Sequence, residues 1–122
     1  MGHSMPIIVY GIRNCDTIKK ARGWLDREGI AYDFHDYKTM GIDAERLKAW
    51  CKEFGWETIL NRSGTTFRKL PETKRENLDL DKAIELMLAQ PSMIKRPIID
   101  TGGRRIVGFS SQVYAEAFGG GR

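Results

Sequence analysis

The chain is poor in cysteine: Cys15 and Cys51 are the only two in 122 residues, and they lie far apart. This usage does not fit a secreted disulfide framework and favours a reducing compartment, so we expect a cytoplasmic protein. No apolar run approaches the roughly 20 residues that cross a bilayer, so no membrane is expected as a partner. Residues 1–4 resemble an expression remnant ahead of a native start at Met5, without the pattern of a secretory signal.

Histidine is equally scarce, and His3 and His35 form no cluster with the cysteines that has metal-ligand spacing. We therefore expect no metal and no bound cofactor, and we expect His35 to be structural or solvent-facing. The net charge of +4 comes from Lys and Arg scattered over the chain. A dispersed excess of this size is typical of a solubilising surface, so nucleic acid is not predicted as a partner. We expect a monomer.

Apolar periodicity predicts one α/β domain over residues 5–118, followed by a glycine-rich tail at 119–122 that should be disordered. The expected elements are a strand at Pro6–Tyr10 closed by Gly11, a helix at Asp16–Glu28, a strand at Ala31–Tyr37, a helix at Asp43–Phe54, a less regular stretch at Glu57–Leu70, a helix from Asp79 or Asp81 to before Pro91, strands at Ile98–Ile99 and Arg105–Phe109, and a last helix capped by Ser110 and Ser111. A right-handed crossover makes the first two strands parallel and puts the first helix N-terminus beside a strand's carboxyl end.

Cys15 is the strongest candidate for a reactive residue, because it stands between the first strand and the first helix. The first amides of a helix lack intrahelical partners and favour a thiolate over a thiol. Arg13 and Lys19 supply positive charge, and Asn14 and Thr17 can hydrogen-bond the thiolate or an oxyanion. The alternative for any lone cysteine is a small buried hydrophobe. The position at a helix start favours the nucleophile.

A second thiol for this nucleophile is missing nearby, since neither Ile12 nor Ile18 is a cysteine and the Cys-X-X-Cys of thioredoxins is absent. The sequence therefore predicts that an external thiol resolves any mixed disulfide. Cys51 could in principle be a resolving thiol. It shares a helix face with Trp50 and Phe54, however, which favours a structural role in the core.

Four segments resemble the arsenate reductase ArsC family: residues 10–22, 34–37, 61–70 and 94–98. The resemblance runs from about Pro6 to Phe118 and is closest to the YffB branch, with the Spx regulators as more distant relatives. It implies a thioredoxin-like fold of the order β-α-β, helical insertion at about 41–90, then β-β-α on a mixed central sheet. It also implies that the insertion caps one nucleophilic cysteine, with glutathione or glutaredoxin as the reductant.

The dipeptide Arg96-Pro97 resembles the family's cis-proline, which sits opposite the cysteine and turns a backbone edge toward an extended thiol substrate. X-Pro bonds tolerate the cis form at a cost of about 1 kcal/mol or less. By itself, Pro97 would be taken for a strand-edge or turn residue. Arg96 then matches the family arginine that projects into the anion pocket, where a bidentate donor suits arsenate, a thiolate or a carboxylate; its alternative is a solvated surface arginine.

The other arginines of the anion pocket are less clearly matched. Arg62 aligns with a second pocket arginine, and Arg68 competes for that role. Where arsenate reductases carry a third anion-binding arginine in the final strand, this sequence has Gly108, with Arg104 and Arg105 nearby but differently placed. The resemblance thus favours arsenate less strongly as the physiological substrate.

We therefore expect a glutathione-dependent thiol oxidoreductase of the arsenate reductase type, with a monothiol mechanism in which Cys15 attacks arsenate or a small oxidised thiol. The alternative is a Spx-like redox-responsive transcriptional regulator that binds RNA polymerase. Spx regulators typically carry Cys-X-X-Cys, and Ile18 occupies the second position here. A third hypothesis is a module that binds glutathione or small anions without turnover.

Overall fold

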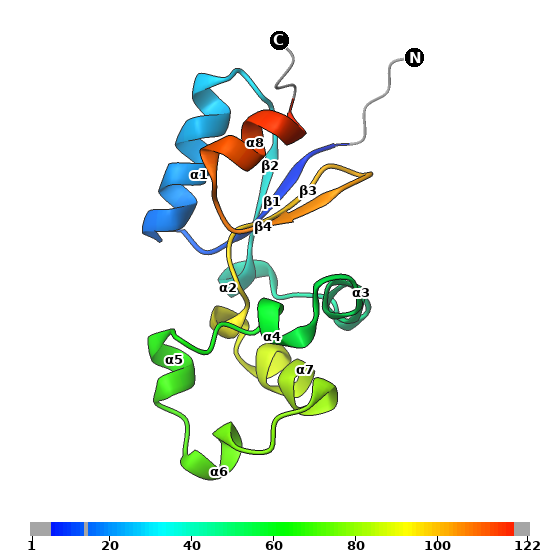
Figure 1. The fold of residues 1–122 in the computed structure, drawn as a ribbon. Coiled ribbons are helices and arrows are strands. Elements are labelled where there is room, and N and C mark those ends of the chain that lie inside the picture. Colours follow the sequence, from blue (N-terminus) through cyan, green and yellow to red (C-terminus); the bar gives the residue numbers. More distant parts are fainter. Residues whose placement is uncertain (1–5, 14, 119–122) are drawn as a thin grey trace. The chain divides into compact units, whose positions relative to one another are not determined.

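The computed structural model describes residues 6–13 and 15–118 (Figure 1). The chain divides into two compact units. The first comprises the chain up to Asp36 and from Arg96 onward, and the second is Tyr37–Lys95. The second unit includes the segment 41–90 that the sequence marks as a helical insertion.

The first unit is built on a four-stranded sheet with the order β2-β1-β3-β4. Its strands are β1 (Ile8–Gly11), β2 (Asp33–Asp36), β3 (Ile98–Asp100) and β4 (Arg105–Val107). β1 pairs with β2 in parallel and with β3 antiparallel, and β3 and β4 form an antiparallel hairpin. The mixed sheet, the parallel β-α-β unit and the final β-β-α order are those predicted.

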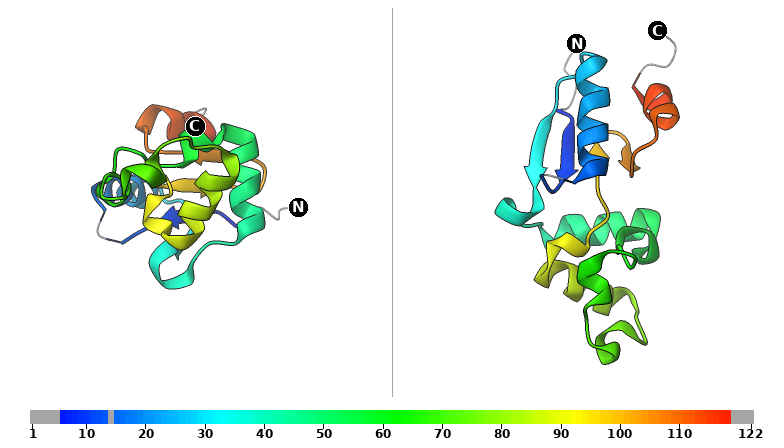
Figure 2. Two further views of the ribbon diagram at one scale, coloured as in Figure 1. Left: turned by 90° about the horizontal axis from the view of Figure 1, so that it is seen from below. Right: turned by 90° about the vertical axis from the view of Figure 1, so that its left-hand side faces the viewer.

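Two helices pack on one face of this sheet, α1 (Asp16–Arg27) and α8 (Ser111–Ala117), as Figure 2 shows. α1 buries Ile18, Ala21 and Leu25 at helical spacing, because apolar residues three and four apart share one side of a helix. From α8, Tyr114 enters the same core, which Val9, Ile99 and Ile106 line from the sheet. Ser110 caps α8 as predicted, accepting a hydrogen bond from the Val113 N–H at 3.3 Å.

Two strands end earlier than predicted, those expected at Ala31–Tyr37 and Arg105–Phe109. β2 is shorter than predicted, because Tyr37 begins α2 (Tyr37–Met40), buries its ring and donates from its hydroxyl to the Lys95 carbonyl at 3.4 Å. β4 ends at Val107 because Gly108 adopts a φ of +85°, a left-handed conformation that breaks the extended strand.

The second unit is helical. Its elements after α2 are α3 (Ala44–Phe54), α4 (Trp56–Ile59), α5 (Thr65–Arg68), α6 (Glu72–Arg75), α7 (Leu80–Ala89) and a 3-10 turn, η1 (Pro91–Met93). Asp79 is the cap of α7, accepting a hydrogen bond from the Lys82 N–H at 2.9 Å. The stretch predicted as less regular contains the two short helices α4 and α5. Leu47, Trp50, Ile59 and Met87 are among the side chains that fill the core of this unit.

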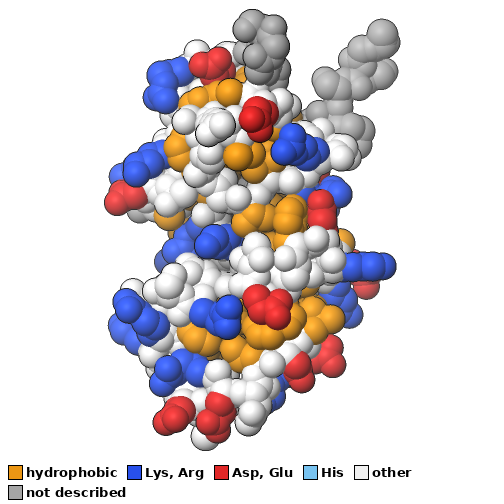
Figure 3. Space-filling model, viewed as in Figure 1, with side chains coloured by type: hydrophobic (Ala, Val, Ile, Leu, Met, Phe, Trp, Pro, Cys, Tyr) orange, Lys and Arg blue, Asp and Glu red, His pale blue; other side chains and the backbone are white. Residues whose placement is uncertain are grey.

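The surface carries charges of both signs. In Figure 3, Lys and Arg side chains are interspersed with Asp and Glu over the face shown. In the parts of the chain that the structure describes, no helix is both long and apolar enough to pass through a membrane.

Candidate active site around Cys15

The site begins at Gly11, the last residue of β1, from which the chain leads to α1. A Cβ added at this position would overlap the buried Ile18 side chain of α1 and lie 3.7 Å from the Arg96 Cβ. A glycine here lets α1 pack closely against the end of the strand. The first turn of α1 is thereby brought against the carboxyl end of β1.

Cys15 is the N-cap residue of α1, with extended backbone dihedrals, and its side chain is half-buried. Its carbonyl accepts the first helical hydrogen bond, from the Lys19 N–H at 2.9 Å. Its side chain makes no capping hydrogen bond, but the backbone N–H groups of Ile18 and Thr17 lower the pKa of the thiol. These N–H groups are among the first amides of the helix, which lack intrahelical partners and favour a thiolate.

Arg96 completes the surroundings of the sulfur. Burial by itself raises the pKa of the Cys15 thiol, but the backbone N–H groups of Ile18 and Thr17, a side-chain hydrogen bond from Arg96 and the positive charge of Arg96 outweigh it. The pKa of Cys15 is therefore lowered from its ordinary value. The arrangement combines an ionisable sulfur with a guanidinium that can also hold an anionic substrate group.

The Arg96–Pro97 peptide bond is cis, as the resemblance implied, and Pro97 is buried. The Pro97 carbonyl accepts a hydrogen bond from the Gly108 N–H at 2.8 Å. The Gly108 carbonyl in turn accepts one from the Tyr114 hydroxyl at 2.8 Å. Arg96 is thus attached to a segment held by β4 and α8.

The predicted neighbours of Cys15 differ in what they contribute to the site. Asn14 lies outside the described residues, Thr17 contributes its backbone N–H, and the Lys19 side chain is exposed. The sequence assigned the positive charge to Arg13 and Lys19, whereas the charge that lowers the pKa of Cys15 belongs to Arg96. The Arg13 guanidinium lies instead over the Phe34 ring, which is 5.7 Å away.

Arg62 and Arg68 both belong to the second unit and are exposed. The Arg62 guanidinium lies 5.7 Å from the centroid of the Trp56 ring, and Arg68 is the last residue of α5. The assignment of either arginine to the anion pocket stays a prediction.

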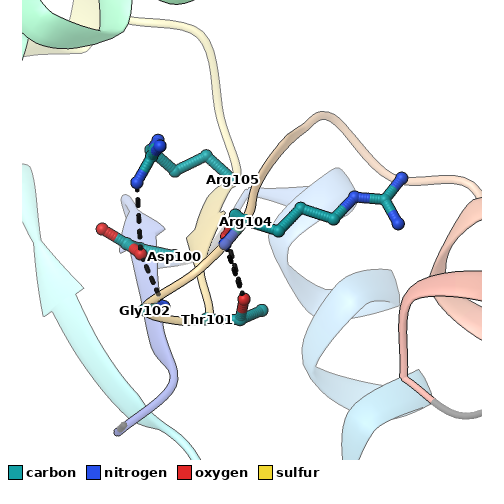
Figure 4. Close-up of polar contacts among 5 residues, drawn as sticks. All are labelled: Asp100, Thr101, Gly102, Arg104 and Arg105. Atoms are coloured by element: carbon teal, nitrogen blue, oxygen red, sulfur yellow. Dashed lines mark hydrogen bonds and ion pairs between the residues drawn. The ribbon is translucent and has the colours of Figure 1, made fainter.

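Arg104 and Arg105 belong to the β3–β4 hairpin (Figure 4). Arg105 forms an ion pair with Asp100 at 3.8 Å, and Asp100 also accepts a hydrogen bond from the Gly102 N–H at 2.8 Å. The Arg104 backbone closes the turn with Thr101, and its side chain points away from this ion pair. The hairpin therefore uses Arg105 to stabilise its own turn.

Cys51 is 4 % exposed, and burial raises the pKa of its thiol to about 11. Its burial confirms the prediction that Cys51 packs in the core. His35 stacks on Tyr10 with a ring-centroid distance of 4.8 Å. Both cysteines are free thiols, and no group of three or more His, Cys, Asp or Glu within residues 6–13 and 15–118 is placed to hold a metal ion.

One contributor to the site was missed in the sequence, Gly11. The Ile18 N–H is among the first amides of the helix predicted to start at Asp16, which the sequence already assigned to the thiolate. Gly11 was taken for a strand terminator. Its role in helix packing depends on where the Ile18 side chain lies, which no local pattern reveals.

Known proteins resemble this chain in sequence and in fold. The chain is similar to the solved structure of the YFFB protein, with 63% identity, a TM-score of 0.88 and coverage of 91% of this chain and 97% of that one. It is also similar to an arsenate reductase (ArsC) related protein from Brucella melitensis, with 55% identity, a TM-score of 0.75 and coverage of 98% and 99%. The global transcriptional regulator Spx of Streptococcus mutans is 29% identical over 99 residues, 80% of this chain and 72% of Spx. A profile of the ArsC family matches residues 10–117, and the chain therefore belongs to the ArsC family.

Proposed function

We propose that the protein is a thiol oxidoreductase of the arsenate reductase type that uses Cys15 as a single nucleophilic thiol and glutathione as reductant. The observation that carries this proposal is the position of Cys15 at the start of α1, where the N–H groups of Ile18 and Thr17 and the guanidinium of Arg96 lower the pKa of the thiol. A larger thiolate fraction at neutral pH means more of the attacking species.

The reaction balances with one external thiol per turnover. The Cys15 thiolate attacks the glutathione sulfur of a glutathionylated substrate, forms a Cys15–glutathione disulfide and expels the substrate thiolate, which takes a proton from water. A glutathione thiolate then attacks the glutathione sulfur of that disulfide, releasing the Cys15 thiolate and oxidised glutathione. The substrate gains two electrons, and two glutathione sulfurs end as one disulfide.

The residues around the sulfur have separate roles in this scheme. Arg96 holds an anionic group of the substrate, and the Ile18 and Thr17 N–H groups stabilise Cys15 as the thiolate whenever it leaves. Pro97 forms the wall against which an extended thiol substrate lies. Glutaredoxin is an alternative reductant for the Cys15 adduct. We place this chemistry in a monomer in the cytoplasm, where glutathione is kept reduced.

Arsenate is the second substrate in this proposal. Its reduction to arsenite also takes two electrons, which two glutathione molecules supply by forming one disulfide. Gly108 has no side chain to contribute to an oxyanion pocket, and a Cβ built there meets no atom within 4 Å. The open space favours a bulkier thiol substrate over a small tetrahedral oxyanion.

The test couples product formation to glutathione reductase and follows NADPH loss with two rival substrates, arsenate and a small mixed disulfide of glutathione. We expect turnover of the mixed disulfide by the wild type and by Cys51→Ser, and none by Cys15→Ser. Mass spectrometry after treatment with oxidised glutathione should find the adduct on Cys15. An adduct on Cys51 alone, or full activity of Cys15→Ser, would refute the proposal.

A regulatory function is the second candidate, favoured by the similarity to Spx over 80% of this chain. Ile18 stands where a second cysteine of a Cys-X-X-Cys sensor would stand, so such a regulator would sense oxidation through Cys15 alone. Retention of RNA polymerase α subunit by the immobilised protein, combined with no turnover of either substrate, would support regulation over catalysis.

A further inference from the structure

Near Cys15 in the sequence, two arginines lie over aromatic rings at the start of β2. The Arg22 guanidinium of α1 lies 4.3 Å from the centroid of Phe34 and 5.6 Å from that of Tyr32. Its Nε donates a hydrogen bond to the Tyr32 hydroxyl at 2.9 Å. The Arg13 guanidinium lies over the same Phe34 ring, with its Nε 4.0 Å from the Asp36 carboxylate. We call Arg13, Arg22, Tyr32 and Phe34 the arginine–aromatic strip.

The charges of the strip are only partly neutralised. The Arg13 side chain is 65% exposed, and its partner Asp36 is buried. In the described part of the chain, no carboxylate lies within 4.0 Å of the Arg22 guanidinium. An arginine stacked on aromatic rings keeps donors available for a carboxylate, and its stacking lowers the entropy lost when that carboxylate binds.

The strip also borders the terminal strand of the sheet. In the sheet order β2-β1-β3-β4, β2 is terminal and pairs with β1 alone among the described strands. Extended peptides add to sheets at terminal strands. Arg13 stands two residues before Cys15 in the loop from β1 to α1, so a peptide on the strip ends close to the nucleophile.

The sign of the charges selects the kind of peptide. Two guanidinium groups favour carboxylates, because carboxylate and guanidinium form paired, planar hydrogen bonds. A long polyanion such as a nucleic acid would extend past the two guanidinium groups and meet the exposed carboxylates of Asp33, on the same strand, and Asp26, one helical turn beyond Arg22. A short acidic segment fits this pattern better.

We propose that the arginine–aromatic strip docks an acidic segment of a protein or peptide whose oxidised cysteine is then delivered to Cys15. The inference rests on the proposed function, because it names the substrate class of the same nucleophile. Docking charges of this kind act mainly on the rate of encounter and on the choice of partner.

The experiment uses two synthetic peptides with one glutathionylated cysteine, identical except that four flanking residues are Glu in one and Gln in the other. We expect the wild type to use the Glu peptide with a kcat/KM about three- to tenfold higher at low salt, a preference that 0.5 M NaCl abolishes. Arg22→Gln and Arg13→Gln should each lower the Glu-to-Gln ratio about two- to fivefold. Arg27→Gln, which removes an exposed charge from the same helix, should leave the ratio unchanged.

Arg22→Lys keeps the charge but not the planar fork and should retain part of the preference, between the wild type and Arg22→Gln, which separates docking from a loss of folding. Equal use of both peptides by the wild type, or an effect of Arg27→Gln as large as that of Arg22→Gln, would overturn the docking proposal and leave the proposed function intact. If neither peptide is turned over, the proposed function fails. Fluorescence anisotropy with Cys15→Ser and the unoxidised Glu peptide then tests the strip directly: no salt-sensitive binding, or tighter binding of a poly-dT oligonucleotide, would contradict it.

Discussion

Replacing Arg96 by Met should make Cys15 a weaker nucleophile. The Arg96 side chain donates a hydrogen bond to the Cys15 sulfur and places a positive charge beside it, and both lower the pKa of the thiol. Met keeps a similar apolar stem without either contribution. The pKa of Cys15 should therefore rise toward the value set by burial and the two backbone N–H groups.

The size of the effect follows from one charge-assisted hydrogen bond. Such a bond contributes about 1.5–3 kcal/mol when buried. For the half-buried Cys15 we expect the lower end of this range, because solvent screens the interaction between the sulfur and Arg96. About 1.4 kcal/mol corresponds to a factor of ten in an equilibrium. At a pH below the thiol's pKa, Arg96→Met should thus carry roughly tenfold less thiolate than the wild type.

Alkylation by iodoacetamide as a function of pH measures this directly, because only the thiolate reacts. The rate profile of Arg96→Met should move to higher pH, and that of Arg96→Lys should fall between the two, since Lys keeps the charge but not the planar fork. Arg27→Met, which removes an exposed arginine from α1, is the matched control. An unchanged profile for Arg96→Met, with the fold intact by circular dichroism, would refute the assigned role of Arg96.

Three further predictions concern stability, each read from urea unfolding. Burial raises the pKa of Cys51 to about 11 in the folded state, whereas the unfolded value is about 8.5. The neutral thiol therefore contributes on the order of 3 kcal/mol to the free energy of unfolding below about pH 8.5, and this contribution is lost as the pH rises through about 11. The stability advantage of the wild type over Cys51→Ala should shrink between pH 8 and 11, and a constant difference would contradict this prediction. Gly11→Ala should lower the free energy of unfolding by about 1–3 kcal/mol, because the added methyl group overlaps the Ile18 side chain in a packed core. An unchanged midpoint of urea unfolding would show that the Ile18 side chain can move aside without cost. Tyr114→Phe should cost about 1–3 kcal/mol by leaving the Gly108 carbonyl without its hydroxyl donor, and a neutral effect would mean that water replaces the hydroxyl.

Much of the fold could be predicted because its signals are local. The spacing of Ile18, Ala21 and Leu25 marks the buried face of α1, and Asp79 and Ser110 begin helices through short-range hydrogen bonds to N–H groups three residues later. Strand ends were less predictable. Tyr37 has a strand former's side chain, yet it begins α2 and contacts Lys95, since burial and a distant carbonyl outweigh local propensity.

For the site, the sequence alone determined that the protein has one thiol at a helix start, that neither Ile12 nor Ile18 offers a second thiol, and that Arg96 precedes a proline. These are properties of adjacent residues. Only the tertiary structure decided that Arg96, and not Arg13, reaches the Cys15 sulfur. The reason is that electrostatic influence on a thiol depends on distance in space, and the sheet order brings β3 beside β1 while Phe34 and Asp36 hold Arg13 on the other side of β1.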